Sequence, residues 1–171
     1  NRLRSTRNLI DRTVQRLLGA EFRRAGRAPA SLQPFTTLVA APTAGSFSIT
    51  IKLAVEIGGQ LPLMLSASTV IEEILDGIEL LNRESYSLLR EKIPQQAYYR
   101  NFVVLARDIA PDGKKISSVG LSSLKRSVGL TRARSSIELP PESGREIQMD
   151  TPVEITGILD YASARRRKES V

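Results

Sequence analysis

The chain has 171 residues, of which 41% are hydrophobic, and it carries a net charge of +7 without any histidine or cysteine. This length and composition fit one ordinary domain whose core is mostly aliphatic, because aromatic residues make up only 5% and tryptophan is absent. The missing imidazoles and thiols exclude Ser-His-Asp and Cys-His catalysis, ordinary structural zinc sites and disulfides, and they favour a reducing, cytoplasmic location.

Residues 2–24 are predicted to form an amphipathic helix. Apolar side chains recur along it at helical spacing, while most of its arginines lie off that stripe. The stripe is a candidate interface with a protein partner or a second copy of the chain, and it consists of Leu3, Ile10, Val14 and Leu17. Gly26, Pro29 and Pro34 then break the pattern, so residues 25–36 are expected to be a loop or linker.

Strict alternation of apolar and polar residues predicts a strand at residues 46–53. One face of this strand would be buried and the other solvated. The buried face would consist of Phe47, Ile49, Ile51 and Leu53. Gly58-Gly59 marks a turn, and residues 61–65 are expected to return as the second strand of a hairpin.

The clearest helix pattern starts near residue 69. Thr69 and Glu72 fit a capping box, and an apolar stripe follows while acidic side chains project elsewhere. The pattern breaks near residues 82–85, resumes as a second segment and ends at Pro94. A further helix is predicted at residues 95–109.

The last third of the chain is predicted to be mostly strand and loop. Residues 110–114 carry a strong turn signal, and a short strand is expected through residues 116–121. A short helix could follow at 122–133, and the polar stretch 135–151 is expected to be a loop. Residues 152–171 are expected to form a C-terminal strand or β-hairpin, cut short at the end of the chain.

The positive charge is concentrated at the two ends of the chain. Residues 1–27 hold eight arginines against two acidic residues, a net charge of +6, and residues 165–169 add +3. The 137 residues between carry 13 basic and 15 acidic side chains. Arg-rich segments neutralise phosphates and release counterions, which gives salt-sensitive, sequence-independent binding of nucleic acid. The side chains predicted to make such contacts are Arg2, Arg4, Arg7, Arg12, Arg16, Arg23, Arg24, Arg165, Arg166, Arg167 and Lys168.

Other partners of the basic helix are an acidic protein or, less favourably, a membrane surface. Membrane binding is disfavoured because the helix lacks tryptophan and has only one aromatic residue, Phe22. Tyr98-Tyr99-Arg100 is a second candidate contact, since such rings can stack on bases. The more common arrangement places one ring of such a pair in the core.

Two constellations could carry catalysis. Ser122 and Lys125 match the S-x-x-K spacing, but the companion motifs are absent and chance explains the match. Glu72, Asp76 and Glu79 share one helix face and could hold Mg²⁺. The alternatives for these carboxylates are a solvated helix face or a docking surface for a basic partner. No Gly-rich phosphate loop is present. Because the remaining constellations have simpler structural explanations, we expect no catalytic residue, no metal and no cofactor.

No apolar run is long enough to cross a membrane. Spanning a bilayer takes roughly 18 apolar residues, and the best candidate, residues 53–71, is interrupted by Glu56, Pro62 and two glycines. No apolar segment follows the Arg-rich first residues, so no signal peptide is predicted. Because the first residue is Asn1, we expect the chain to be a fragment or a processed product.

The middle of the chain carries a family resemblance. The features behind it are Pro42-Thr43-Ala44-Gly45-Ser46-Phe47-Ser48-Ile49 entering a strand, the long acidic helix, the Tyr-containing helix at 95–109, and the Pro111-Asp112-Gly113-Lys114 turn. Over about residues 42–124 these features resemble a family of uncharacterised bacterial domains, some of them associated with anti-phage defence. The resemblance implies an accessory or scaffolding domain and supplies no catalytic residues.

These patterns predict an α+β fold: a small antiparallel sheet packed by two or three helices, preceded by an Arg-rich amphipathic helix and followed by a C-terminal β-hairpin. The expected divisions are 1–30 (basic helix and linker), 31–134 (α+β core), 135–151 (loop) and 152–171 (strand or hairpin). The favoured function is a non-catalytic module that binds nucleic acid through its Arg-rich ends. The alternatives are a protein-interaction or oligomerisation module of a bacterial multi-protein system and, less favoured, a metal-dependent enzyme.

Overall fold

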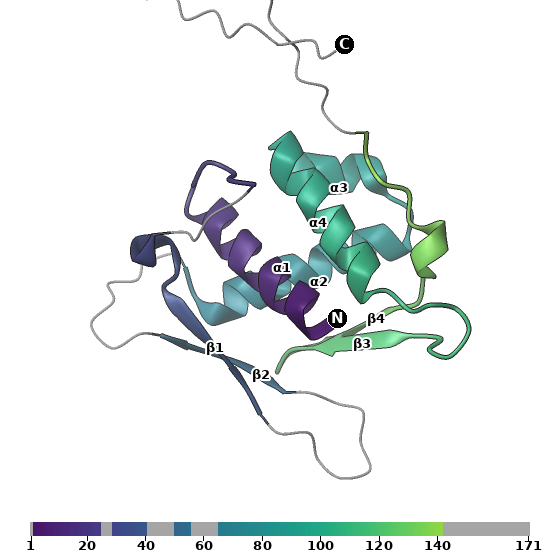
Figure 1. Cartoon of the computed structure of the whole chain (residues 1–171), viewed down its shortest axis with the longest axis horizontal. Helices are drawn as coiled ribbons and strands as arrows, with labels where there is room; N and C mark the ends of the chain where they lie inside the picture. Colours follow the sequence, from purple (N-terminus) through teal and green to yellow (C-terminus); the bar gives the residue numbers. More distant parts are fainter. Residues whose placement is uncertain (1, 25–28, 41–49, 56–64, 142–171) are drawn as a thin grey trace, which may run out of the picture.

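The computed structural model describes residues 2–24, 29–40, 50–55 and 65–141. These residues form four α-helices and two antiparallel two-stranded sheets, which confirms the predicted α+β class (Figure 1). The helices are α1 (Arg2–Leu17), α2 (Ala67–Asn82), α3 (Tyr86–Lys92) and α4 (Gln96–Ile109). The strands are β1 (Phe35–Val39), β2 (Ile51–Val55), β3 (Val119–Ser122) and β4 (Ser127–Leu130), with 3-10 turns at Ala30–Leu32 and Arg134–Ser136.

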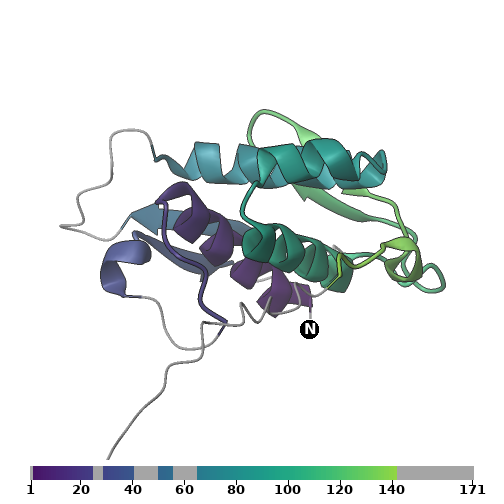
Figure 2. The same ribbon diagram turned by 90° about the horizontal axis from the view of Figure 1, so that it is seen from above.

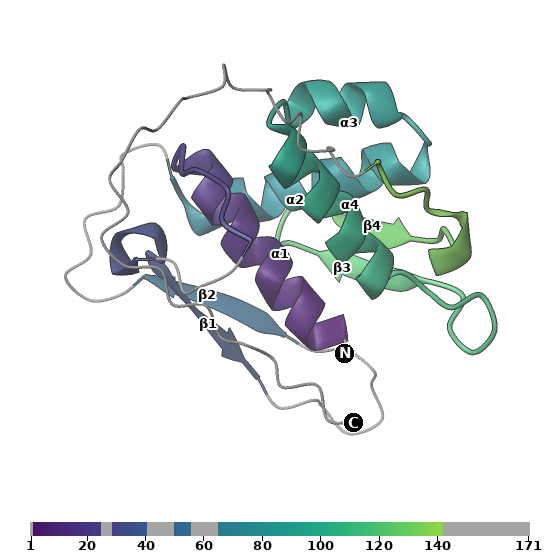
Figure 3. The same ribbon diagram turned by 45° about the horizontal axis from the view of Figure 1, so that its top comes forward.

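Helix α2 lies between two layers of the molecule. The β3–β4 hairpin covers one side of α2, and α1 and α4 lie on the other side (Figure 2). The β1–β2 pair lies beside α1 (Figure 3). One core joins these elements, and its most deeply buried side chains include Leu9 of α1, Ile78 of α2, Val103 of α4 and Leu130 of β4.

Helix α1 ends at Leu17, well before the predicted end at residue 24. Gly19 has a φ of +70°, in the left-handed region that favours glycine. The backbone N–H groups of Gly19 and Ala20 donate to the carbonyls of Arg16 and Gln15, each at 2.9 Å. This is a Schellman ending, so the helix stops at a glycine that lies inside the predicted helical pattern.

The predicted long helix from residue 69 is divided into α2 and α3, as the break near 82–85 indicated. Its N-terminal cap differs from the predicted one. Ser66 Oγ accepts a hydrogen bond from the N–H of Thr69 at 3.1 Å, so Ser66 is the cap and Thr69 lies in the first turn. Helix α4 matches the helix predicted at 95–109 within one residue.

The sheet described in this region is the β1–β2 pair. Strand β2 contains the Ile51–Leu53 part of the predicted strand and pairs with β1, in the register Phe35↔Val55 to Val39↔Ile51. Residues 46–49 and 61–64 lie outside the described residues, and Leu65 is described but belongs to no strand. The loop predicted for 25–36 is wrong at its end, because β1 begins at Phe35 with aromatic and β-branched residues that favour strands.

The β3–β4 hairpin replaces the helix predicted at 122–133. The chain turns over residues 123–126, where the N–H of Ser123 donates to the carbonyl of Arg126 at 2.8 Å. Side chains alternate across the hairpin: Leu121 and Val128 pack against the core, whereas Gly120 and Gly129 are exposed. The alternation has the period of two that is typical of strands, and glycine disfavours helix. The helix predicted at 122–133 is therefore wrong. The C-terminal hairpin predicted at 152–171 lies outside the described residues.

None of the described helices is both long enough and apolar enough to cross a membrane.

Candidate nucleic-acid interface

The acidic face of α2 is bound by one arginine from the β3–β4 turn. Arg126 donates from Nε to Glu72 at 2.8 Å and from Nη1 to Glu79 at 3.1 Å. Its Nη2 contacts Asp76. From the same turn, Ser123 Oγ donates to the other oxygen of Glu72 at 2.9 Å. The three carboxylates considered as a metal site or a docking surface are therefore bound to a cation of the chain itself.

A second set of ion pairs continues this network toward α1 and α3. Glu73 accepts hydrogen bonds from Arg16 Nη2 at 2.8 Å and from Lys92 Nζ at 3.0 Å. Lys92 also pairs with Asp76 at 3.0 Å, which connects this set to Arg126. Burial alone would raise the pKa of Glu73 and Asp76, but the hydrogen bonds from these cations outweigh burial and hold both pKa values below their usual range.

Neither catalytic constellation suggested by the sequence is assembled in the described residues. There, no group of three or more Asp and Glu side chains is arranged to hold a metal ion. Ser122 is the last residue of β3 and Lys125 lies in the turn after it, so the S-x-x-K spacing does not place the two groups one helical turn apart. The carboxylates and the turn instead fasten the β3–β4 hairpin to α2.

Two of the predicted nucleic-acid contacts, Arg2 and Arg16, are directed at acceptors inside the fold. Arg2 donates to the carbonyls of Ile109 and Ala110 at 3.1 and 3.3 Å. The C-terminus of a helix carries partial negative charge, so this guanidinium stabilises the end of α4. The side chain of Arg16, which pairs with Glu73, is only 12% exposed.

The segment after α1 runs back along the helix. Tyr98 Oη donates to the carbonyl of Ala20 at 3.0 Å, and the rings of Phe22 and Tyr98 meet edge to face with centroids 5.1 Å apart. The guanidinium of Arg12 lies 5.0 Å from the centroid of the Phe22 ring. Because Arg12 belongs to the middle of α1, the chain around Phe22 lies beside this helix.

Four arginines of α1 and the returning segment are exposed, and we call this group of side chains the α1 cationic face. They are Arg4, Arg7, Arg23 and Arg24. Asp11 and Glu21 are the acidic residues within the same stretch of chain. Burial raises the pKa of Asp11, although the positive charges of Arg7 and Arg12 act in the opposite direction. The exposed guanidinium groups outnumber these two carboxyl groups, so the face is positive.

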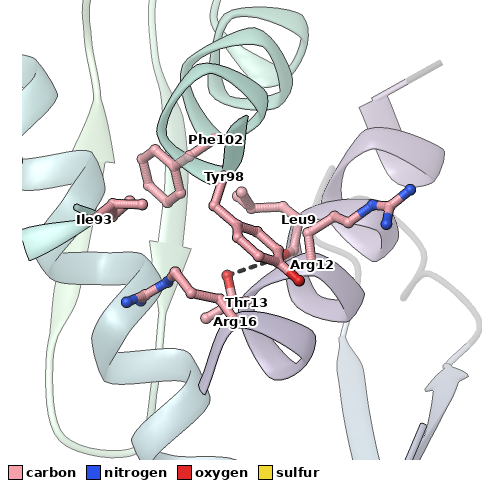
Figure 4. A pocket seen from close by; sticks show the side chains of 7 residues that line it. All are labelled: Leu9, Arg12, Thr13, Arg16, Ile93, Tyr98 and Phe102. Carbon is pink, nitrogen blue, oxygen red and sulfur yellow. Dashed lines mark hydrogen bonds between the residues drawn. The ribbon is translucent and has the colours of Figure 1, made fainter. Parts of the chain in front are cut away.

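A small cavity lies between α1 and α4 (Figure 4). Its lining includes Arg12, Thr13, Arg16 and Tyr98, and Thr13 Oγ1 donates to the carbonyl of Leu9 at 2.8 Å. The volume is about 10 Å³, room for about one water molecule. This cavity cannot hold a substrate.

The tyrosines that are candidates for stacking on bases and the apolar stripe that is a candidate protein interface are mostly buried. Tyr98 and Tyr99 are 4% and 6% exposed, so their rings are not available to stack on bases. In the candidate interface stripe, Ile10 and Val14 are each 3% exposed and belong to the chain's own core. Leu17, also from the stripe, is partly buried against that core, and Leu3 is exposed.

The tail cations, Arg165, Arg166, Arg167 and Lys168, lie outside the described residues. No protein-family model, curated protein or solved structure matches the chain.

Sequence patterns did not single out Arg126, although it binds three carboxylates. Its partners are 47 to 54 residues away in the chain, a separation at which no local spacing can indicate a contact. The available signal was the excess of acidic residues on one face of α2, because a half-buried group of carboxylates requires a cation nearby.

Proposed function

We propose that this chain is a non-catalytic binding module whose α1 cationic face contacts the phosphate backbone of nucleic acid. The observation that supports the proposal most directly is how the chain uses its charges. The acidic side chains of α2 are paired with cations of the fold, whereas the arginines of the α1 cationic face are exposed to solvent. Guanidinium groups can bind phosphates through two parallel hydrogen bonds, so these arginines suit a phosphate backbone.

Binding of this kind requires no base-specific contacts. Phosphate contacts fix position and supply affinity but carry no direct sequence information. We therefore propose sequence-independent binding, with the basic residues of the C-terminal tail as additional contacts. A cytoplasmic location and an accessory role in a bacterial multi-protein system fit this proposal and remain predictions.

The alternative functions are less well supported by the geometry. A protein interface built on the apolar stripe of α1 would use Ile10 and Val14, and both are buried in the core. Metal-dependent catalysis at Glu72, Asp76 and Glu79 would require these carboxylates to give up Arg126.

The proposal is tested with two variants that each lose three positive charges, one from the α1 cationic face and one from other parts of the surface. The test variant replaces Arg4, Arg7 and Arg23 with glutamine. The control variant replaces three exposed cations of other elements, Lys52, Arg90 and Lys125, with glutamine. Binding of each variant to a fluorescein-labelled DNA duplex is measured by anisotropy at low salt.

We expect the test variant to bind about 10-fold or more weakly than the control, because only the test variant loses phosphate contacts. Equal affinities of the two variants would show that net charge alone attracts the duplex, and would contradict a defined face. Circular dichroism melting of both variants checks that neither set of substitutions unfolds the chain.

A further inference from the structure

The loop that follows α4 holds the backbone of two lysines in a fixed conformation. Asp112 Oδ1 accepts hydrogen bonds from the backbone N–H groups of Lys114, Lys115 and Ile116, at 2.9, 2.8 and 3.0 Å. These hydrogen bonds lower the pKa of Asp112 to about 2, so the carboxylate stays ionised at neutral pH. Gly113 permits the turn with a φ of +73°.

The loop is also anchored at its start. Pro111 is fully buried, and its carbonyl accepts a hydrogen bond from the N–H of Arg134 at 2.8 Å. Both lysine side chains are nevertheless exposed. A loop that is ordered before binding loses less conformational entropy when it meets a ligand, so the two ammonium groups are well placed for contacts.

The loop is positive because its two lysines outnumber its one carboxylate, Asp112. The carboxylate of Asp112 is directed at the loop's own N–H groups, and Asp108 lies 3.7 Å from Arg134. Among the described residues, no carboxylate pairs with Lys114 or Lys115.

The loop is also close to the start of α1. Arg2 binds the last carbonyls of α4, and its charge acts on Asp112. The loop therefore lies beside the helix end that carries Arg4 and Arg7, at the N-terminus of α1 (Figures 1 and 3).

Resting on the proposed function, we infer that Lys114 and Lys115 form a second phosphate-binding site for the nucleic-acid backbone, continuous with the α1 cationic face, and that Asp112 positions them. The ligand class is a phosphodiester backbone. Asp112 is a positioning residue, since its carboxylate binds the loop and repels phosphate.

The lysines are tested through the salt dependence of duplex binding. Each phosphate contact contributes about 0.9 to the slope of log affinity against log salt concentration. The double variant Lys114→Gln, Lys115→Gln should therefore reduce the magnitude of the slope by about 1.8 relative to the unchanged chain. An unchanged slope would overturn the inference while leaving the proposed function in place. Failure of the unchanged chain to bind the duplex at low salt would instead overturn the proposed function.

The positioning role is tested by two substitutions that remove the same charge. Asp112→Asn keeps an oxygen that can accept the three N–H groups, whereas Asp112→Ala does not. Loss of a negative charge should strengthen phosphate binding in both, so electrostatics alone predicts equal gains. We expect Asp112→Ala to bind about 3-fold or more weakly than Asp112→Asn, because the lysines lose their fixed arrangement. Equal affinities would overturn the positioning role.

Discussion

Helix α4 packs closely on α2 at a position where α2 has no side chain. The ring of Phe102, on α4, packs directly over Gly77, and a Cβ placed on this glycine would lie 3.0 Å from Cε1 and Cε2 of the ring and closer still to Cζ. Real Cβ atoms essentially never approach so closely, and Phe102 is 6% exposed and surrounded by core. The approach of α4 to α2 therefore depends on this glycine.

Gly77→Ala should lower the free energy of unfolding by about 1–2 kcal/mol. Overpacking costs about 1–3 kcal/mol, and the better helix propensity of alanine returns up to about 1 kcal/mol. Urea denaturation measures the change. Gly120→Ala is the control, because a Cβ at this exposed strand position meets no atom within 4 Å, and we expect a change within about 0.5 kcal/mol. Equal effects of the two substitutions would contradict the close packing.

The position of Gly77 illustrates what sequence can and cannot show about single residues. A glycine in the middle of a helix pattern suggests close packing, but its partner lies on another helix and carries no local signal. The same limit applies to the arginines of α1. The positive charge of these arginines can be read from the sequence. Which of them bind the fold depends on other helices: α4 binds Arg2, and α2 binds Arg16.

At the scale of elements, the β3–β4 hairpin is held to α2 by polar contacts as well as by its apolar face. Asn82, at the end of α2, donates to the carbonyl of Gly129 at 2.6 Å and accepts from the N–H of Thr131 at 3.3 Å. Arg126 fastens the turn at the other end of the hairpin. The hairpin is therefore held to α2 both at its turn and at the end of β4.

Arg126→Gln should destabilise the chain more than Arg83→Gln does. Arg126 contacts three carboxylates and its removal leaves their negative charges close together, whereas Arg83 makes one exposed pair with Glu79 and its side chain is 68% exposed. The urea midpoints of the two variants give the comparison. Equal midpoints would show that the network adds little to stability.

Helices and strands can be predicted from the sequence where the spacing of apolar residues within one segment indicates them. The periodicity of α2, α3 and α4 is strong, and the structure follows it within a few residues. Strand pairing was not predictable, because β1 and β2 are separated by a long stretch of chain and each has only five residues. The hairpin at residues 119–130 was interpreted partly as a helix, since its apolar side chains fit both periods over so short a span.

At the scale of the whole molecule, the ion-pair network makes stability depend on pH. Hydrogen bonds from cations hold the pKa values of Glu73 and Asp76 below the ordinary 4.5 and 3.8, despite opposing burial. The unfolded chain therefore binds more protons than the folded chain in this range, and stability rises with pH. The contribution is present above the ordinary pKa values and is lost as the pH falls below them.

We therefore expect the urea midpoint to be lower at pH 3 than at pH 7, measured at constant ionic strength. Glu73→Gln should reduce the difference between the two midpoints, because a glutamine cannot release a proton. A midpoint that is the same at both values of pH would be inconsistent with the network.

The proposal that the α1 cationic face binds nucleic acid rests on the charge distribution of the whole molecule. Acidic side chains of α2 are paired with cations of the fold, and helix α1, which carries the exposed Arg4 and Arg7, lies on the opposite side of α2 from the β3–β4 hairpin (Figure 2). No local sequence pattern distinguishes these exposed arginines from the arginines that bind acceptors within the fold.

The most direct measurement is the affinity of the unchanged chain for a DNA duplex as a function of salt concentration. Engagement of the four arginines of the face predicts a linear fall of log affinity with log salt, with a slope of about −3.6 or steeper between about 50 and 200 mM. Two duplexes of unrelated sequence should give the same line. Absence of binding at about 50 mM salt, or a slope near zero, would contradict the account.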